Sequence, residues 1–269
     1  LTKDRFSWNI FEDIDVFGKD EDDEDPTRLS ASTIEELFKD NGYNLDTVKE
    51  TKLVNTGNQL TKLPKELKNI ESPKKRKNLF IKIVLPLIIE ENLKIRFDRK
   101  KLFQILNKNI TSTRDKAWLE LKFKQYGVNN NDLEKLKIRM DEIPVSLAIA
   151  QAAKETGWGS SRFAQEGNAL FGQWTWSGEG LKPKDADKNE GHKVMKFNVL
   201  QASVRAYQRN LNTHSTYKGF REERAKLRDE GKPLDSIRLS EFLNKYAETG
   251  NQYVEVLQKI IKQNNLQDF

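Results

Sequence analysis

The chain has 269 residues, of which 33% are charged and 36% hydrophobic, and its net charge is +6. It contains no cysteine and two histidines, which excludes disulfides and thiolate nucleophiles and argues against a zinc enzyme. No P-loop, GxGxxG or GxSxG pattern occurs, which argues against nucleotide binding and acyl transfer. We therefore predict neither a metal ion nor a cofactor. The most apolar run, residues 79–89, is interrupted by Lys82 and Pro86 and is too short to span a bilayer, so we expect no transmembrane segment.

Charge is unevenly distributed along the chain. Residues 1–50 carry a net charge of −9, residues 51–140 carry +13 and residues 141–269 carry +2. The acidic run at 19–26 repels itself, and residues 1–30 are therefore predicted to be an acidic flexible arm. The basic middle would suit an anionic polymer or membrane surface, although solvated helix faces give the same count. No basic-aromatic nucleic-acid module is present, and no nucleic-acid partner is expected.

Residues 31–130 are predicted to form an N-terminal helical region. Ser32–Glu35 has the pattern of a capping box, which predicts a short helix that ends near Gly42. Further along, Ser72 suits a helix cap and Pro73 suits the first turn, so a helix kinked at Pro86 is expected from there.

The rest of the chain is predicted to be mainly helical. Residues 193–198 partly alternate in polarity, which indicates one strand of a small β-hairpin. Periodicity and cap signals predict further helices at residues 115–126, 132–140, 143–155, 200–212, 222–229, 239–248 and 252–264.

The helix expected at 143–155 ends on a carboxylate, Glu155. Its residues are apolar nearly all round, which predicts burial. Apolar surroundings and the negative end of a helix both raise the pKa of a carboxyl group. A group that stays protonated near neutral pH can act as the general acid of glycoside hydrolysis. The alternative is a surface glutamate paired with Lys154 or Arg162.

Aromatic residues follow Glu155 among several glycines. Trp158, Trp174 and Trp176 are candidate platforms for sugar rings, and the last two, beside a polar glycine loop, are the stronger candidates. The alternative is core packing, which we favour for Phe163 and Phe171.

Three segments carry a resemblance to a known family. They are IPVSLAIAQAAKETGWGSSRFAQEGNALFGQW from Ile143, VRAYQRNLNTHSTYKGFR from Val204 and KYAETGNQYVEVLQKII from Lys245. These segments resemble the Bax-type endo-β-N-acetylglucosaminidases of glycoside hydrolase family 73. A looser likeness begins with LPKELKNIESPKKRKNLFIKIVLPLI from Leu63, so that the resemblance runs from about residue 30 to the end.

The resemblance implies a mainly α, lysozyme-like domain over residues 131–269, with a small β-hairpin lobe. It implies that Glu155 is the general acid and that Tyr253 lies near the reacting sugar, with Tyr246 opening the same segment. For the second carboxylate of the family, on the β-lobe, Glu190 is our assignment and Glu179 the reserve. Lys193 stands where the family often has an acidic residue, which weakens this assignment.

Asn212 lies in the second segment of the resemblance. Its amide could hydrogen-bond sugar, which makes it a candidate substrate-binding residue. A structural role at the end of its helix is the alternative for both Asn212 and His214.

The predicted function is that of a peptidoglycan hydrolase, an endo-β-N-acetylglucosaminidase that cuts glycan strands after N-acetylglucosamine. The expected location is the periplasm or cell envelope, with a peripheral association with the membrane or wall left open. A lytic transglycosylase of similar fold and a non-catalytic wall-binding or scaffold protein are the alternatives.

Overall fold

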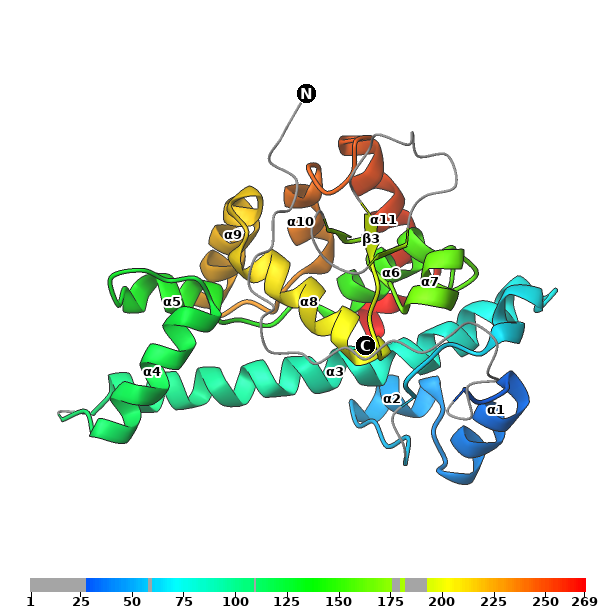
Figure 1. The fold of residues 1–269 in the computed structure, drawn as a ribbon, viewed down its shortest axis with the longest axis horizontal. Helices are drawn as coiled ribbons and strands as arrows, with labels where there is room; N and C mark the ends of the chain where they lie inside the picture. Colours follow the sequence, from blue (N-terminus) through cyan, green and yellow to red (C-terminus); the bar gives the residue numbers. More distant parts are fainter. Residues whose placement is uncertain (1–27, 58–59, 109, 176–179, 182–192) are drawn as a thin grey trace.

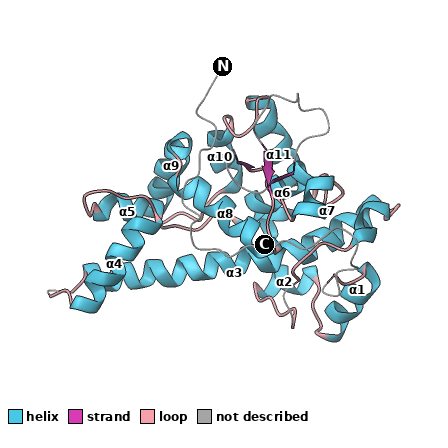
Figure 2. Ribbon diagram, in the orientation of Figure 1, coloured by secondary structure: helices cyan, strands magenta, loops and turns pink. Residues whose placement is uncertain are grey.

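The computed structural model describes residues 28–57, 60–108, 110–175, 180–181 and 193–269, and these are mainly helical (Figures 1 and 2). The α-helices are α1 (Ala31–Asp40), α2 (Leu45–Thr51), α3 (Pro73–Leu106), α4 (Thr113–Gln125), α5 (Leu133–Arg139), α6 (Val145–Thr156), α7 (Arg162–Gly167), α8 (Leu200–Thr213), α9 (Lys218–Asp229), α10 (Ser236–Ser240) and α11 (Asn251–Gln263). Short 3-10 helices occur at Lys65–Asn69, Ser215–Tyr217, Glu241–Leu243 and Leu266–Asp268. The predicted mainly α class is confirmed. Within the described residues, no helix is both long enough and apolar enough to cross a membrane.

The longest element is α3, which runs across the lower part of Figure 1. Its start is the predicted one, because the Ser72 side chain accepts a hydrogen bond from the backbone N–H of Lys75 (3.4 Å) and Pro73 occupies the first turn. The helix continues through Pro86 to Leu106. Elements from both halves of the chain pack against α3.

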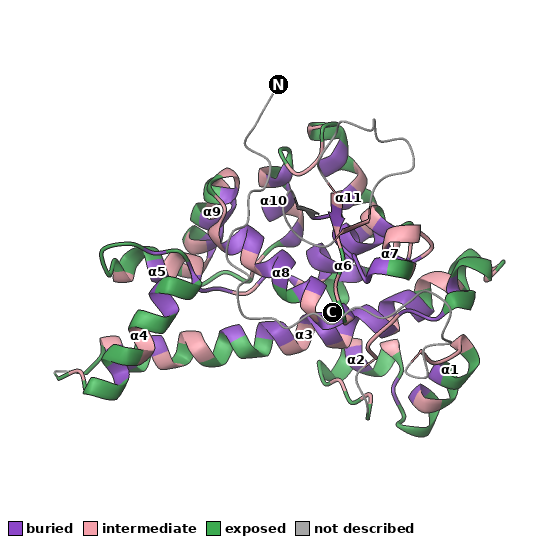
Figure 3. Ribbon diagram, viewed as in Figure 1, coloured by how far each residue is buried: buried purple, intermediate pink, exposed green. Residues whose placement is uncertain are grey.

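The centre of the main core is α6, which packs against α3 and α11 (Figure 3). Its residues 147–150 and Ala152 are fully buried, so the prediction of a buried helix here is confirmed. The same core includes Ile34, Leu67 and Phe80 from the N-terminal region. The main core thus joins residues on both sides of the predicted boundary at residue 130, and that boundary stays a prediction.

A second, smaller core lies where the far end of α3 meets α4 and α5. It is formed by Leu102, Phe123, Tyr126, Leu136 and Met140 together with Val128. This core holds the α3–α4 hairpin in a defined shape at a distance from the main core, and the hairpin projects from the body in Figure 1.

A three-stranded antiparallel sheet forms the β-lobe, in the order β1 (Trp174–Thr175), β3 (Lys193–Met195), β2 (Gly180–Leu181). Val194 lies at the centre, opposite Trp174 on one side and Leu181 on the other. The predicted small β-lobe is confirmed, although its strand at 193–198 ends at Met195.

Two predicted elements are wrong in their bounds. The cap of α1 is Ser30 and not Ser32, because the Ser30 hydroxyl accepts the backbone N–H of Thr33 (3.1 Å). The helix expected at 239–248 ends at Leu243, and turns follow it up to Gly250, whose φ of +57° suits glycine.

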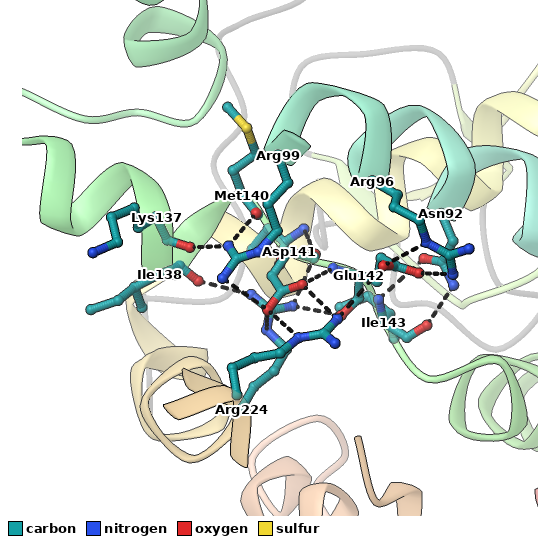
Figure 4. A network of polar contacts seen from close by, with 12 residues as sticks. Asn92, Arg96, Arg99, Lys137, Ile138, Met140, Asp141, Glu142, Ile143 and Arg224 are labelled. Carbon is teal, nitrogen blue, oxygen red and sulfur yellow. Dashed lines mark hydrogen bonds and ion pairs between the residues drawn. The ribbon is translucent and has the colours of Figure 1, made fainter. Parts of the chain in front are cut away.

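The start of α6 is fixed by a buried polar network (Figure 4). Asp141 is 1% exposed, accepts two hydrogen bonds from Arg228 (3.0 and 3.2 Å) and lies 3.8 Å from Arg224. Arg224 is itself fully buried and donates to the backbone carbonyls of Ile138, Asp141 and Glu142. Burial alone would raise the pKa of Asp141, but the charges of the arginines outweigh it and hold that pKa below its usual range. The loop before α6 is therefore tied to α9.

Candidate active site

Glu155 lies in the last turn of α6, at a sharply turned helix end. Gly157 and Trp158 both have positive φ values, +56° and +61°, which end the helix at once. The buried Thr156 closes this turn, since its hydroxyl donates to the carbonyl of Ala152 (2.6 Å) and accepts the N–H of Gly159 (2.9 Å). The Glu155 side chain is only half-buried. A carboxyl group in this position is held by the core yet can meet a ligand from solvent.

Gly172 is in contact with the Glu155 carboxyl group. Its φ is +61°, and a Cβ at this position would lie 2.7 Å from Oε2 of Glu155. That separation is shorter than real Cβ contacts allow. Only glycine lets the loop before β1 approach the acid so closely, and sequence reasoning did not identify it.

A chain of buried hydrogen bonds leads to Glu155. The hydroxyl of Tyr207 donates to Oε1 of Gln151 (2.7 Å), and Nε2 of Gln151 donates to the hydroxyl of Tyr253 (3.1 Å). The Tyr253 hydroxyl in turn faces the carboxylate of Glu155 and lowers its pKa as a hydrogen-bond donor. Gln151 and Tyr207 are fully buried and Tyr253 is 2% exposed. Burial raises the pKa of Tyr253 and keeps its hydroxyl a donor. We call these three residues and Glu155 the acid relay.

The pKa of Glu155 is raised by burial, and this is the predicted direction. The hydrogen bond from Tyr253 and the charge of Lys154 act in the opposite sense without cancelling it. The alternative of a surface glutamate is not what the structure shows, and Arg162 pairs with Glu166 (3.3 Å). The shift is in the direction that favours a general acid.

Two pairs of stacked rings support the relay. Tyr246 stacks on Tyr253, with ring centroids 5.5 Å apart and planes within 10°, and donates its hydroxyl proton to the carbonyl of Phe171 (2.8 Å). Phe171 stacks on Tyr207 at 3.9 Å. Of the predicted site residues, the structure thus brings together Glu155, Tyr253 and Tyr246.

Two other predicted residues, Trp158 and Asn212, are not part of this group. Trp158 packs edge-on against Phe80 (5.9 Å) under the Lys77 ammonium (4.9 Å), although it stays partly exposed. Asn212 is 1% exposed and donates to the carbonyl of Asp141 (2.9 Å), before the other end of α6. This contact is the structural role that was its alternative.

Four predictions lie at the edge of what the structure describes or outside it. The backbone of Trp174 forms β1, but its side chain is outside the described residues. Trp176, Glu179 and Glu190 also lie outside the described residues.

Sequence reasoning placed neither Gln151 nor Tyr207 in the site, and it interpreted Tyr207 as a packing residue. One signal was present, because Gln151 is a polar residue in an otherwise apolar stretch and precedes Glu155 by one helical turn. Tyr207 carried no comparable signal, since its partner is 56 residues away. Among the described residues, no cluster of three or more His, Asp or Glu side chains is placed to hold a metal ion.

Three comparisons with known proteins bear on the family of this chain. The family model described as mannosyl-glycoprotein endo-β-N-acetylglucosaminidase matches residues 131–266. Protein bax of Escherichia coli is 31% identical over 194 residues, which cover 70% of this chain and 69% of that protein. The catalytic domain of the autolysin Auto from Listeria monocytogenes is 21% identical and covers 63% of this chain and 95% of that domain, with a TM-score of 0.36, which is too low to argue the fold.

The family match and the bax relative carry the identification. The matched residues include the whole acid relay and the β-lobe, and they make up half of the chain. The expectation of a glycoside hydrolase is confirmed, and the expected activity on peptidoglycan is supported. This chain belongs to the endo-β-N-acetylglucosaminidase family, in its Bax-type branch.

Proposed function

We propose that the protein hydrolyses the glycan strands of peptidoglycan on the reducing side of N-acetylglucosamine, with Glu155 as the general acid. One observation carries this assignment: Glu155 is half-buried and has a raised pKa, and a tyrosine hydroxyl and a glycine backbone lie against its carboxyl group. An acid that is both protonated and positioned can give its proton to the glycosidic oxygen as the bond to C1 breaks.

The second half of the reaction has two candidate agents. The acetamido carbonyl oxygen of the substrate can attack C1 and form a cyclic intermediate, which water then opens, as in substrate-assisted glycosidases. Glu190, with Glu179 as the reserve, is our proposal for the carboxylate that orients this group or the water. Tyr253 is proposed to assist in orienting the same group, since its hydroxyl lies beside the Glu155 carboxyl group.

Aromatic and polar side chains near the site are proposed to bind the sugars. Trp174 and Trp176 belong to or follow β1, close in sequence to Gly172, and are the favoured stacking platforms. Trp158 and Tyr246 are secondary candidates, because each already makes a ring contact within the protein. A peptidoglycan substrate places the enzyme in the cell envelope, and we propose the periplasm.

Digestion of purified peptidoglycan followed by mass spectrometry of the products tests this function. We expect a new reducing-end N-acetylglucosamine, and Glu155→Gln should lower turnover at least ~100-fold because the amide has no proton to give. Glu166→Gln is the matched control, since that glutamate is exposed and pairs only with Arg162 among the described contacts.

Each competing function predicts a different product. Anhydro-sugar products would show a lytic transglycosylase, and no products from a folded wild-type chain would show a wall-binding or scaffold protein. If the protein is a hydrolase, the turnover of Glu190→Gln should lie between those of the wild type and Glu155→Gln. If Glu179→Gln lowers turnover and Glu190→Gln leaves it unchanged, the second carboxylate is Glu179 and not Glu190.

A further inference from the structure

One face of the α3–α4 hairpin is exposed, apolar and basic. We define the hairpin face by eight residues, all of them exposed: Leu93, Phe97, Lys100 and Gln104 on α3, and Arg114, Ala117, Leu121 and Lys124 on α4. Within each helix these positions follow one another at three- or four-residue spacing, so each set lies on one side of its helix.

The two sets lie on the same side of the hairpin. Ion pairs join Lys108 to Asp115 (2.6 Å) and Lys122 to Asp98 (2.5 Å), so α4 runs back along α3. Phe97 and Leu121 each immediately precede a residue of the second pair. In two right-handed helices of opposite direction, the residues before a facing pair turn about 100° toward the same side. Phe97 and Leu121 are therefore neighbours across the hairpin.

The opposite side of the hairpin is covered by the protein. Arg99 contacts Asp141 (3.7 Å) and Arg96 contacts Glu142 (2.6 Å), in the loop before α6. Phe97 is two residues from Arg99 and so points about 160° away from it. The hairpin face is thus the side that neither α5 nor this loop covers.

The composition of the hairpin face is that of a membrane-surface helix. Phe97 is 70% exposed, Leu121 59% and Leu93 38%, and at the tip of the hairpin Ile110 is 84% exposed. Three of the eight residues are basic and none is acidic, and the exposed Glu120 lies about 100° from Leu121 around α4. Exposed Phe and Leu side chains between Lys and Arg are typical of elements that lie in a lipid interface.

We propose that the hairpin face docks on an anionic lipid surface, with Phe97 and Leu121 inserted among the acyl chains and Lys100, Arg114 and Lys124 on the headgroups. A glycan strand or nucleic acid would contact the basic side chains of the hairpin face but would leave its apolar side chains exposed to water. An acidic lipid surface uses both. This inference concerns where the protein sits and does not depend on the reaction proposed for Glu155.

Binding of the full chain to vesicles tests the docking. Co-sedimentation with vesicles of phosphatidylglycerol and phosphatidylcholine should show binding that falls as the phosphatidylglycerol fraction is lowered. The double variant Phe97→Ser, Leu121→Ser should bind at least about tenfold more weakly. Leu53→Ser is the matched control, because Leu53 is 74% exposed on another part of the chain.

The charge contribution is tested with a second pair of variants. Lys100→Gln with Lys124→Gln should weaken binding several-fold and reduce its salt dependence. Lys39→Gln with Lys262→Gln removes the same charge from exposed positions elsewhere and should bind nearly as the wild type.

Phe97→Trp adds a measurement that does not rely on loss of binding. Its tryptophan emission should shift to shorter wavelength when anionic vesicles are added, beyond any shift of the wild type. The proposal would be overturned by no binding of the wild type, by equal loss in the apolar variant and its control, or by no added shift for Phe97→Trp on bound protein. Equal binding of the apolar variant and the wild type would also overturn it and leave a purely electrostatic contact.

Discussion

The most informative perturbation of the acid relay is Tyr207→Phe, which removes one buried hydroxyl that Gln151 and Tyr253 separate from Glu155. The remaining ring can keep its stack on Phe171, at 3.9 Å. In the wild type, the Tyr207 hydroxyl donates to Oε1 of Gln151 and so turns Nε2 toward Tyr253. With the amide reversed, the Tyr207 O–H would face an N–H donor and lose the Gln151 oxygen as its acceptor, which is costly for a fully buried group. Tyr207 thus selects the amide orientation.

Without that hydroxyl, the amide of Gln151 can turn and present its oxygen to Tyr253. The Tyr253 O–H would then donate to Gln151, and Glu155 would lose its donor. That hydrogen bond lowers the pKa of Glu155, so its loss raises the pKa further. A hydrogen bond to a charged group contributes about 1.5–3 kcal/mol to the stability of the charged form. Because Glu155 is partly exposed, we expect the effect on its pKa to lie at the lower end of this range.

The assay is the pH dependence of kcat/KM on soluble glycan fragments. A general acid works in its protonated form, so activity falls on the alkaline side as Glu155 ionises. A raised pKa moves this alkaline limb to higher pH, while the plateau falls because the carboxyl group is less well held. Tyr253→Phe removes the donor outright and should give the largest shift.

The double variant Tyr207→Phe, Tyr253→Phe is the control for the relay. Both changes act through the hydrogen bond between Tyr253 and Glu155. The alkaline limb of the double variant should therefore lie at the same pH as that of Tyr253→Phe alone. A slower Tyr207→Phe enzyme with an unchanged alkaline limb would refute the reasoning and leave Tyr207 as a packing residue.

Two further changes test the geometry around the acid. Gly172→Ala should lower turnover at least about tenfold, because a Cβ 2.7 Å from Glu155 Oε2 displaces the carboxyl group, with left-handed strain of about 1–2 kcal/mol added. Gly231→Ala has the same strain at φ +64° with nothing within 4 Å, and should keep its turnover in the same assay. Asp141→Asn should lower stability by about 3–5 kcal/mol, measured by thermal denaturation, because it leaves the buried Arg224 without its carboxylate. As the folded pKa of Asp141 is depressed, its contribution is lost when the pH falls through that pKa, and the two melting curves should converge in acid.

Local signals in the sequence predicted most helices correctly. Ser72 and Pro73 mark the start of α3 because both act on the first turn alone. Asp132 caps α5 in the same way. Where tertiary contacts decide, prediction failed: residues after Leu243 leave the helix, and Tyr246 there bonds to Phe171, 75 residues away in the chain.

The same distinction between local signals and tertiary contacts applies to the candidate site. Glu155 could be found because its helix is locally apolar, and Tyr253 because its segment resembles a family segment. The role of Gly172 depends on a loop that passes the acid, which no spacing in the sequence shows. The contacts of Gln151 reach 56 residues in one case and 102 in the other, so only the fold reveals them.

The position of Gln151 explains how one helix can set both the place and the protonation of the acid. It lies four residues before Glu155, so about 6 Å separates the two along one face of α6. The hydroxyl of Tyr253 from α11 contacts both side chains and must fit that fixed spacing. The amide is fully buried, and such a group is tolerated only when its donors and acceptors are matched. The Tyr253 hydroxyl already accepts the hydrogen bond from Gln151, so its own proton is left with Glu155 as the acceptor. The matching of buried donors and acceptors in the core therefore determines which group faces the reactive carboxyl group.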